Sequence, residues 1–344
     1  MTFDPNAAAP EQSGVFGLPH TPAEAQVVLI PVPFEATTSY GGGTSGGPAA
    51  ILSASRQVDL FDVEVGKPYE RGIAMLEESP EVKAWDHAAR LAAAHVIARG
   101  GTHGEPALEA AAASVSEYGL KMNAYVRATT ELFLNRGKMV GTIGGDHSVS
   151  FGAIEAHVAR FASLGPFGVL HFDAHADLRH AYEGFEWSHA SIMENVMRRL
   201  PGVARLVQVG IRDLCEEEHE RIASSDGRIV AFYDADLAEL RFAGETWAQQ
   251  CARMVAALPQ QVYVSFDIDG LDPALCPHTG TKVPGGLSFQ MATSLLRATA
   301  ESGRTIVGFD LTEVAPARDG SEWDENVGAR MLYKLIGWAL RSRR

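Results

Sequence analysis

The sequence predicts an α/β fold in which one mainly parallel sheet is covered by helices. Eight short runs rich in Val and Ile recur along the chain, and each is short enough for a strand that is buried on both faces. Stretches with helical spacing lie between these runs, and such alternation implies right-handed crossovers between parallel strands. The spacing continues without a Pro, Ser or Gly linker, so we expect residues 25–344 to form a single domain.

The expected elements can be placed in order along the chain. Strands are expected at residues 27–31, 72–76, 139–143, 168–173, 206–209, 229–233, 262–267 and 306–311. The clearest helical patterns cover residues 82–98, 106–135, 188–200, 287–300 and 326–340. Residues 1–24 mix Pro, Ala, Gly and polar groups without a period, which predicts a flexible tail outside the core. This segment resembles neither a secretory signal nor an Arg-rich transit peptide, which favours a cytoplasmic protein.

Composition limits the classes of partner. Lys and Arg total 29 against 43 Asp and Glu, and the net charge of -14 would repel nucleic acid and anionic membrane surfaces. No segment approaches the roughly 18 continuous apolar residues of a membrane span. The three cysteines are odd in number and lack C-x-x-C spacing, which argues against a disulfide framework or a thiolate zinc site. We therefore expect a small-molecule substrate, with no nucleic acid and no membrane as partner.

Acidic groups or histidine follow four of the expected strands, in segments 144–148 (GGDHS), 173–177 (DAHAD), 267–273 (DIDGLDP) and 312–314 (TEV). Because the carboxyl ends of neighbouring parallel strands face one crevice, these segments should converge. Residues two apart on a strand point to the same side, so Asp173 and His175 can address one point, as can Asp267 and Asp269. Asp177 would lie about 13 Å from Asp173 on a straight strand, so the chain must turn there.

Four carboxylates and two imidazoles then form a candidate metal site, made of His147, Asp173, His175, Asp177, Asp267 and Asp269. Carboxylates buried without partners would neutralise rather than stay ionised, so cations are required. Two divalent ions would offset about four negative charges, and oxygen-rich ligation with only two imidazoles favours Mn²⁺ over zinc. The alternative, that these carboxylates merely cap helices, does not explain why three strands each end in a matching cluster.

The strings G-G-D-H-S, D-A-H-A-D and S-F-D-I-D-G-L-D-P resemble those of the ureohydrolases, the family of arginase and agmatinase, from about residue 27 to the C-terminus. The resemblance implies a three-layer α/β/α sandwich with a central mainly parallel sheet, assembled into a homo-oligomeric trimer or hexamer. It also implies two Mn²⁺ ions per chain. One would be bound by His147, Asp173, Asp177 and Asp267. The other would be bound by Asp173, His175, Asp267 and Asp269.

The same resemblance implies catalytic roles for residues outside the metal ligands. Glu313 would hold the guanidinium group of the substrate, and His189 would shuttle protons at the rim of the site. The proton for the leaving amine would come from Asp177 or from a water relayed by His189. The implied reaction is hydrolysis of a guanidino compound to urea and an amine.

The loop at residues 178–188 resembles the agmatinase version and favours an agmatine-like substrate. Glu183 and Glu186 would attract a terminal ammonium group. Arg179 and His180 could instead bind a carboxylate if they point inward, so arginase, guanidinobutyrase or guanidine hydrolase activity stays an alternative. A two-metal phosphoesterase would need Lys or Arg in the motifs, which contain none, and a catalytically silent binding homologue would have no need of the intact ligand set.

Several neighbours of the motifs are expected to play supporting roles. His171 is interpreted as a buried hydrogen-bonding neighbour rather than a metal ligand. Asp146, Ser148, Ser265 and Asp272 are interpreted as residues that orient ligands. Nothing near Cys276 suggests a lowered pKa, so we interpret it as a spectator thiol. Trp323 would narrow the pocket toward a smaller substrate.

Overall fold

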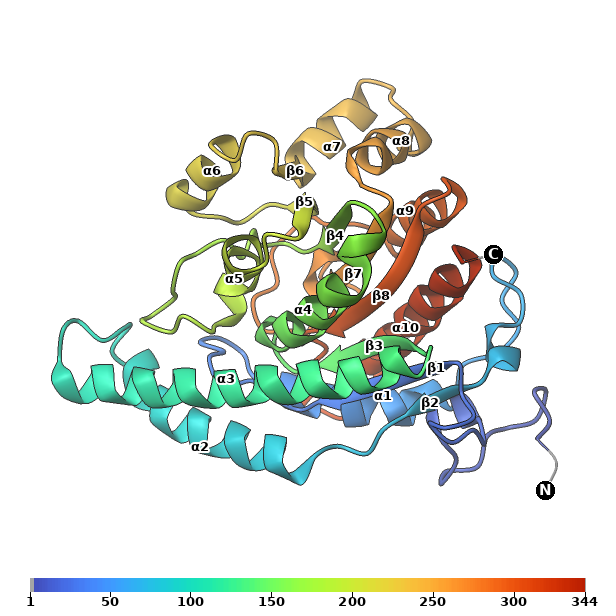
Figure 1. Cartoon of the computed structure of the whole chain (residues 1–344), viewed down its shortest axis with the longest axis horizontal. Coiled ribbons are helices and arrows are strands. Elements are labelled where there is room, and N and C mark those ends of the chain that lie inside the picture. Colours follow the sequence, from blue (N-terminus) through green and yellow to red (C-terminus); the bar gives the residue numbers. More distant parts are fainter. Residues whose placement is uncertain (1–2, 344) are drawn as a thin grey trace.

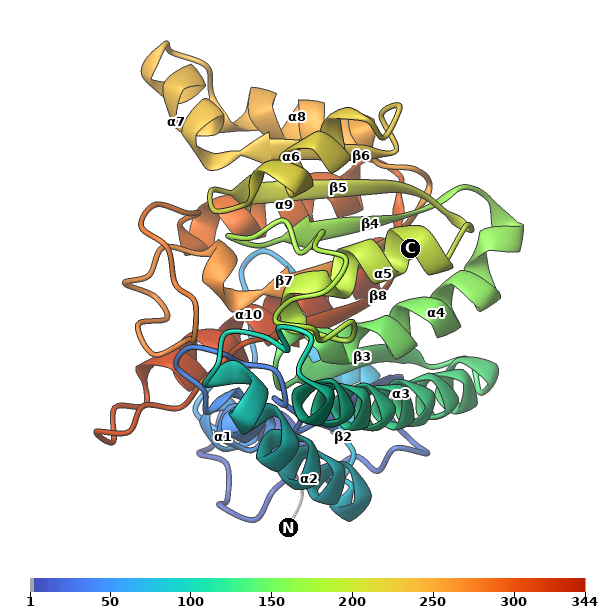
Figure 2. The ribbon, with the colours of Figure 1, turned by 90° about the vertical axis from the view of Figure 1, so that its left-hand side faces the viewer.

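Eight strands form one sheet in the computed structural model, which describes residues 3–343 (Figure 1). The strands are β1 (Val27–Val32), β2 (Ile73–Met75), β3 (Met139–Gly144), β4 (Phe167–Phe172), β5 (Val203–Ile211), β6 (Ile229–Tyr233), β7 (Gln261–Asp267) and β8 (Thr305–Thr312). Their order is β2-β1-β3-β8-β7-β4-β5-β6, and each neighbouring pair is parallel. Figure 2 shows this order, from β6 at the top to β2 at the bottom. The predicted α/β class and all eight predicted strands are confirmed.

Helices connect the strands. The α-helices of residues 3–343 are α1 (Gly47–Ser55), α2 (Pro80–Ile97), α3 (Pro106–Asn135), α4 (Ser150–Phe161), α5 (Ile192–Arg199), α6 (Glu216–Ala223), α7 (Asp234–Phe242), α8 (Trp247–Ala257), α9 (Phe289–Glu301) and α10 (Trp323–Arg341). Short 3-10 helices are η1 (Val15–Gly17), η2 (Thr44–Gly46), η3 (Pro68–Arg71), η4 (His147–Val149), η5 (Ala162–Leu164), η6 (His189–Ser191) and η7 (Ile268–Gly270). The helix predicted at 188–200 begins as η6, because the Ser188 side chain accepts a hydrogen bond from Ala190 N at 3.1 Å.

The helices cover both faces of the sheet. Side chains alternate along β1, so Val27 and Leu29 pack in the core that faces α1 and α7 to α10. Val28 and Ile30 pack in the second core, which faces α2 to α6. Figure 1 shows α4 and α5 on one side of the strands and α9 and α10 on the other. This arrangement is the three-layer α/β/α sandwich that the resemblance implied.

The segment before β1 corrects one expectation. Val15, Phe16 and Leu18 are almost fully buried in the core on the α10 face, although residues 1–24 were expected to form a tail outside it. Phe16 N donates a hydrogen bond to Ser55 Oγ at 2.9 Å, and its ring centroid lies 4.9 Å from that of Tyr333. The apolar groups enter the core through a three-residue 3-10 helix with a positive φ of 55° at Phe16. Such a short element leaves no period in the sequence.

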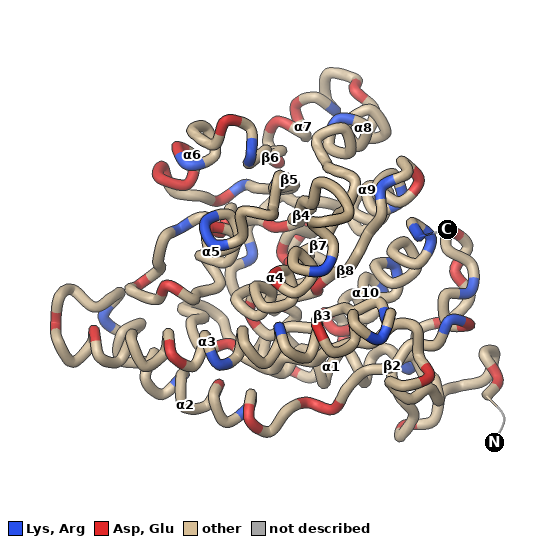
Figure 3. Tube along the Cα trace, viewed as in Figure 1, with Lys and Arg blue, Asp and Glu red and all other residues tan. Residues whose placement is uncertain are grey.

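The outer surface carries both signs of charge. Acidic and basic residues are interspersed along the outer helices in Figure 3, and α6 is mainly acidic. Its first turn contains Glu216, Glu217 and Glu218, which interact favourably with the partial positive charge of a helix N-terminus. Among residues 3–343, no helix combines the length and the apolar character needed to cross a membrane.

The four motif segments converge at one edge of the sheet. They follow β3, β4, β7 and β8, which are adjacent in the central order β3-β8-β7-β4. Because these strands are parallel, their carboxyl ends lie side by side. The predicted convergence is confirmed, and it places the candidate site in the middle of the sheet.

Candidate metal centre

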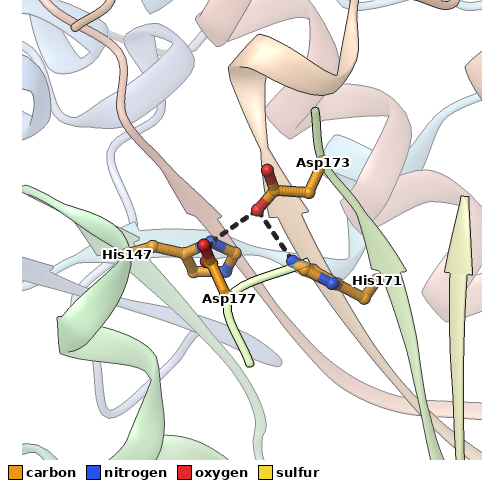
Figure 4. A group of neighbouring side chains, drawn as sticks. All are labelled: His147, His171, Asp173 and Asp177. Atoms are coloured by element: carbon orange, nitrogen blue, oxygen red, sulfur yellow. Dashed lines mark hydrogen bonds and ion pairs between the residues drawn. The ribbon is translucent and has the colours of Figure 1, made fainter. Parts of the chain in front are cut away.

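A cluster of carboxylates surrounds the imidazole of His147. Its Nδ1 lies 3.0 Å from Asp173 Oδ2, 3.3 Å from Asp177 Oδ2 and 3.3 Å from Asp267 Oδ2. Figure 4 shows His147, Asp173 and Asp177 pointing toward one another. All four side chains are buried. The structure therefore brings four of the six predicted ligands into contact.

His175 and Asp269 form a second group that shares Asp173 with the first. His175 Nδ1 lies 3.1 Å from Asp269 Oδ2 and 3.4 Å from Asp173 Oδ1. The other oxygen of Asp173, Oδ2, faces His147. One carboxylate whose two oxygens face different ligand groups suits a pair of neighbouring cations. All six predicted ligands thus lie in one site.

Asp177 reaches the site because the chain turns there, as the sequence required. Its φ is 54°, in the left-handed region that few residues other than glycine adopt. Two backbone amides at the start of α5, those of Met193 and Glu194, donate to Asp177 O at 3.0 and 3.1 Å. Leu178 N donates to Glu218 Oε1 at 2.9 Å. These tertiary hydrogen bonds stabilise an otherwise unfavourable backbone conformation.

The cluster concentrates negative charge in the protein interior. Burial, followed by the nearby carboxylates of Asp269 and Asp173, raises the pKa of Asp267 well above its ordinary value. Burial and the Asp173 charge raise the pKa of Asp177 to about 7. Burial opposes protonation of His175, but Asp269 and Asp173 outweigh it and raise its pKa to about 12. The raised pKa values mean that these groups hold protons more tightly than usual. The negative charge and the oxygen-rich donor set of the site fit divalent cations in their place.

A row of buried polar side chains lies two residues before the cluster along strands β4 and β7. The sheet register places Gln208 beside His171, His171 beside Ser265, Ser265 beside Asp310, and Asp310 beside Thr142. The row therefore crosses five neighbouring strands at one level, and each member is fully buried. Buried polar groups need hydrogen-bond partners, and within the row Ser265 bonds Asp310 and Gln208 bonds His171.

The row orients His147 toward the carboxylates. Ser265 Oγ donates to Asp310 Oδ1 at 2.9 Å and lies 2.8 Å from His147 Nε2. Because the serine proton is directed at Asp310, Nε2 of His147 donates to the serine oxygen. Its Nδ1 is then unprotonated in the neutral ring and suited to bind a cation.

The row also explains why His171 lies beside the cluster without the character of a ligand. Gln208 Nε2 donates to Ala176 O at 2.7 Å and lies 3.0 Å from His171 Nδ1, which accepts its second proton. His171 Nε2 therefore carries the ring proton and donates it to Asp173 Oδ2 at 2.8 Å (Figure 4). This geometry supports the interpretation of His171 as a hydrogen-bonding neighbour that holds Asp173.

Glu313 lies at the same edge, directly after β8. Its Oε1 accepts a hydrogen bond from His147 N at 2.9 Å, and its carbonyl accepts one from Thr279 Oγ1 at 2.7 Å. Its φ of 63° is another left-handed conformation of a residue other than glycine. Burial, followed by the Asp146 carboxylate, raises the pKa of Glu313 well above its ordinary value. A buried, fixed carboxylate of this kind is suited to bind a guanidinium group.

His189 begins η6 and is held by Thr37. The Thr37 hydroxyl lies 3.3 Å from His189 Nδ1 and accepts a hydrogen bond from His189 N at 3.3 Å. The Tyr182 ring packs edge-on against the imidazole, with centroids 5.9 Å apart. Burial, followed by the charges of His175 and His147, lowers the pKa of His189 to about 4. A neutral imidazole at the edge of the site can accept a proton and return it.

The carboxylate of Glu186 is not free to bind a substrate. Its Oε1 pairs with the guanidinium groups of both Arg198 and Arg199, so its charge is already compensated. The expectation that Glu186 attracts a substrate ammonium group is therefore wrong. Arg179 is engaged as well, because its Nε lies 3.7 Å from Glu218 Oε2 and its guanidinium covers the Tyr182 ring at 5.2 Å.

Glu183 differs from Glu186. It lies in a tight turn that is closed by hydrogen bonds between the backbones of Tyr182 and Phe185, and its φ is 52°. Its Oε2 is buried and has no hydrogen-bond partner within residues 3–343. Burial raises the pKa of Glu183. A carboxylate oxygen in this state can accept a hydrogen bond from a cationic ligand.

Sequence reasoning missed two supporting residues and misplaced one. Asp310 could have been found, because an acidic residue inside an apolar strand must find buried partners. Thr37 left no local signal, since it contacts His189 from 152 residues away in the sequence.

Trp323 is about half exposed and donates from Nε1 to Ala274 O at 3.1 Å, so it braces a loop instead of narrowing the pocket. Cys276 is buried, and burial raises the pKa of its thiol, as expected of a spectator.

Comparison with known proteins identifies the family. The model of the arginase family matches residues 25–337. The N(1)-aminopropylagmatine ureohydrolase of Thermus thermophilus is 36% identical over 325 residues, which cover 94% of each chain. The agmatinase of Proteus mirabilis is 31% identical over 316 residues, which cover 91% of this chain and 87% of that protein.

The fold agrees with this relationship. The proclavaminate amidino hydrolase of Streptomyces clavuligerus aligns with a TM-score of 0.72 at 24% identity, over 98% of this chain and 100% of that one. The chain belongs to the arginase family and is a metal-dependent amidinohydrolase.

Proposed function

We propose that the protein uses two Mn²⁺ ions to hydrolyse a guanidino amine, agmatine or N(1)-aminopropylagmatine, to urea and an amine. The observation that carries the proposal is the pair of ligand groups that share Asp173. Relatives named agmatinase and N(1)-aminopropylagmatine ureohydrolase support the substrate class. They favour this reaction over a two-metal phosphoesterase and over a catalytically silent binding protein.

The six clustered side chains would hold the two ions. One ion would be bound by His147, Asp173, Asp177 and Asp267. The other would be bound by Asp173, His175, Asp267 and Asp269. When bound, a pair of divalent cations supplies an activated water as nucleophile at neutral pH. The carboxylate-rich set with two imidazoles favours Mn²⁺ over zinc.

Residues of the chain would bind the substrate and move its protons. The Glu313 carboxylate would orient the guanidinium group through charge-assisted hydrogen bonds, and its own backbone contacts limit its movement. His189, neutral and fixed by Thr37, would accept a proton and deliver it to the leaving amine. Asp177 is the alternative donor.

Removal of the metal should abolish turnover, and Mn²⁺ should restore it, because two ligand groups that share one carboxylate require two cations. Chelation followed by titration with Mn²⁺, Ni²⁺ or Zn²⁺, with urea release as readout, tests both the requirement and the choice of ion. Metal analysis of the active protein should give about two ions per chain. Fully active protein with less than one ion per chain would contradict the proposal.

Guanidino amines should be preferred over guanidino acids, because Glu183 offers a carboxylate oxygen that bonds no other group of residues 3–343, while Arg179 is paired with Glu218. We expect kcat/KM for agmatine or N(1)-aminopropylagmatine to exceed that for arginine and guanidinobutyrate at least about tenfold, or about 1.4 kcal/mol. Glu183→Gln should raise KM for the amine. Glu186→Gln is the matched control on the same loop and should leave KM unchanged, since Glu186 is paired with arginines.

The opposite ranking of substrates separates the parts of the proposal. A tenfold higher kcat/KM for arginine, guanidinobutyrate or free guanidine would overturn the amine assignment and leave the reaction class standing.

We further propose that the protein is a homo-oligomer, a trimer or hexamer, in the cytoplasm, and that residues 25–344 are one domain. Light scattering of the purified protein measures the assembly.

A further inference from the structure

We propose that His278 and Asp324 form a positioning pair for this reaction. Together they would fix the loop between η7 and α9, residues 271–288, so that Glu313 and Asp269 keep their places in the site. The kinetic part of this inference rests on the proposed function. The geometric part rests on hydrogen bonds that join the loop to both carboxylate residues.

Two hydrogen bonds join His278 to Asp324. Asp324 lies in the first turn of α10 and is fully buried. Its Oδ1 accepts a hydrogen bond from His278 N at 2.8 Å, and its Oδ2 lies 2.8 Å from His278 Nδ1. Because a carboxylate can only accept here, Nδ1 donates, and one side chain fixes both the backbone and the ring of His278. Losing either bond would leave part of a buried carboxylate unpaired.

Two threonines shortly after His278 contact residues of the site. Thr279 is buried, and its Oγ1 donates to the carbonyl of Glu313 at 2.7 Å. Thr281 Oγ1 lies 3.5 Å from Asp269 Oδ2, at the limit of a hydrogen bond. Glu313 has a strained backbone conformation that persists only where its surroundings hold it in place. Fixing His278 therefore limits the movement of the two threonines and of the groups that they contact.

The far end of the loop has a separate anchor. The Arg212 guanidinium donates to Val283 O at 3.0 Å and to Asp269 O at 2.7 Å. Between the anchors, the loop packs against the segment at Gly41 with backbone in contact with backbone. A Cβ added at Gly280 would lie 2.8 Å from Tyr40 O. The His278–Asp324 pair is thus the anchor on the side of Glu313, while Arg212 holds the side of β5.

His278→Ala tests the pair in the full metal-loaded protein. We expect kcat/KM for the preferred guanidino substrate to fall on the order of 10- to 100-fold, because small displacements of positioning groups have effects of that size. His278→Asn should recover most of the loss, since its amide nitrogen can donate in place of Nδ1. The matched control is His219→Ala, which removes a histidine whose Nδ1 bonds Tyr233 OH at 3.1 Å on α6. This control should keep the activity of the unaltered protein.

Thr279→Val provides a second, nearly isosteric test if His278→Ala fails to fold. It removes the donor to Glu313 O and should lower kcat/KM in the same direction. In the double variant with His278→Ala the losses should not add, because both substitutions act through the same loop. Activity of His278→Ala equal to that of the His219→Ala control would overturn the proposal, as would a loss that His278→Asn does not recover.

Titration with Mn²⁺ alone distinguishes the failure of this proposal from failure of the proposed function. Calorimetry of the metal-free protein should show weaker Mn²⁺ binding in His278→Ala than in His219→Ala, because Thr281 contacts the predicted ligand Asp269. If the unaltered protein releases no urea from any guanidino compound while this difference persists, only the proposed function fails. Equal Mn²⁺ binding, together with unchanged kcat/KM, would sink the positioning role.

Discussion

Asp267→Asn is expected to remove metal and activity together, with kcat/KM lower by about 10³-fold or more. Asp267 Oδ2 lies 3.3 Å from His147 Nδ1, and its Oδ1 accepts from Asp269 N at 2.8 Å, so it links the two ligand groups. Loss of a ligand shared by two cations removes several kcal/mol of transition-state stabilisation. Metal analysis and urea release measure both effects. Asp272→Asn is the control in the same motif, because the structure leaves that side chain exposed although it was predicted to orient ligands.

The order of thermal stability between Asp267→Asn and the unaltered protein should reverse when metal is removed. Burial raises the pKa of Asp267 above its value in the unfolded chain. Between those two values the unfolded chain has released a proton that the folded protein retains, so metal-free stability falls as pH rises through this window. The variant lacks this titration. In EDTA at pH 8 it should unfold at the same temperature as the unaltered protein or higher, whereas with Mn²⁺ the unaltered protein should be the more stable. A variant that retains two ions would contradict the bridging assignment.

His189→Ala is expected to lower kcat by about 10²- to 10⁴-fold while metal content stays intact. The imidazole is held by Thr37 at 3.3 Å and belongs to neither ligand group, so its loss should leave the ligands in place. Steady-state kinetics combined with metal analysis and Tm separates this result from general damage. His95→Ala, on the exposed face of α2, is the control. Unchanged kcat in His189→Ala would exclude the residue from the mechanism.

The sheet and the ligand cluster were predictable because their signals are local. A strand buried on both faces must be continuously apolar, so Asp or His directly after it marks the edge where parallel strands end. This reasoning predicted that Asp173 and Asp267 lie near one another, which they do, and the distance that a straight strand would cover required the turn at Asp177. Family resemblance added Glu313, whose carboxylate accepts a hydrogen bond from His147 N, and His189, which is close enough to His175 and His147 for their charges to lower its pKa.

Two of the helices that the sequence did not reveal bury little. Helix α6 buries only Glu218, and α7 buries only Leu237, so neither leaves an apolar stripe with helical period. The N-terminal segment failed for a related reason, since Phe16 enters the core from an irregular turn. Periodicity detects a repeated burial pattern, and a single buried side chain has no period.

The sequence by itself therefore determined the order of strands and helices along the chain and the residues at the strand ends. Only the tertiary structure decided how those residues are paired. It compensates Glu186 with two arginines, leaves Glu183 Oε2 without a hydrogen-bond partner among residues 3–343, and sets Asp310 beside Ser265 and below His147. The physical reason is that local composition specifies which side chains are buried, whereas their partners depend on sheet order and register between segments far apart in the chain.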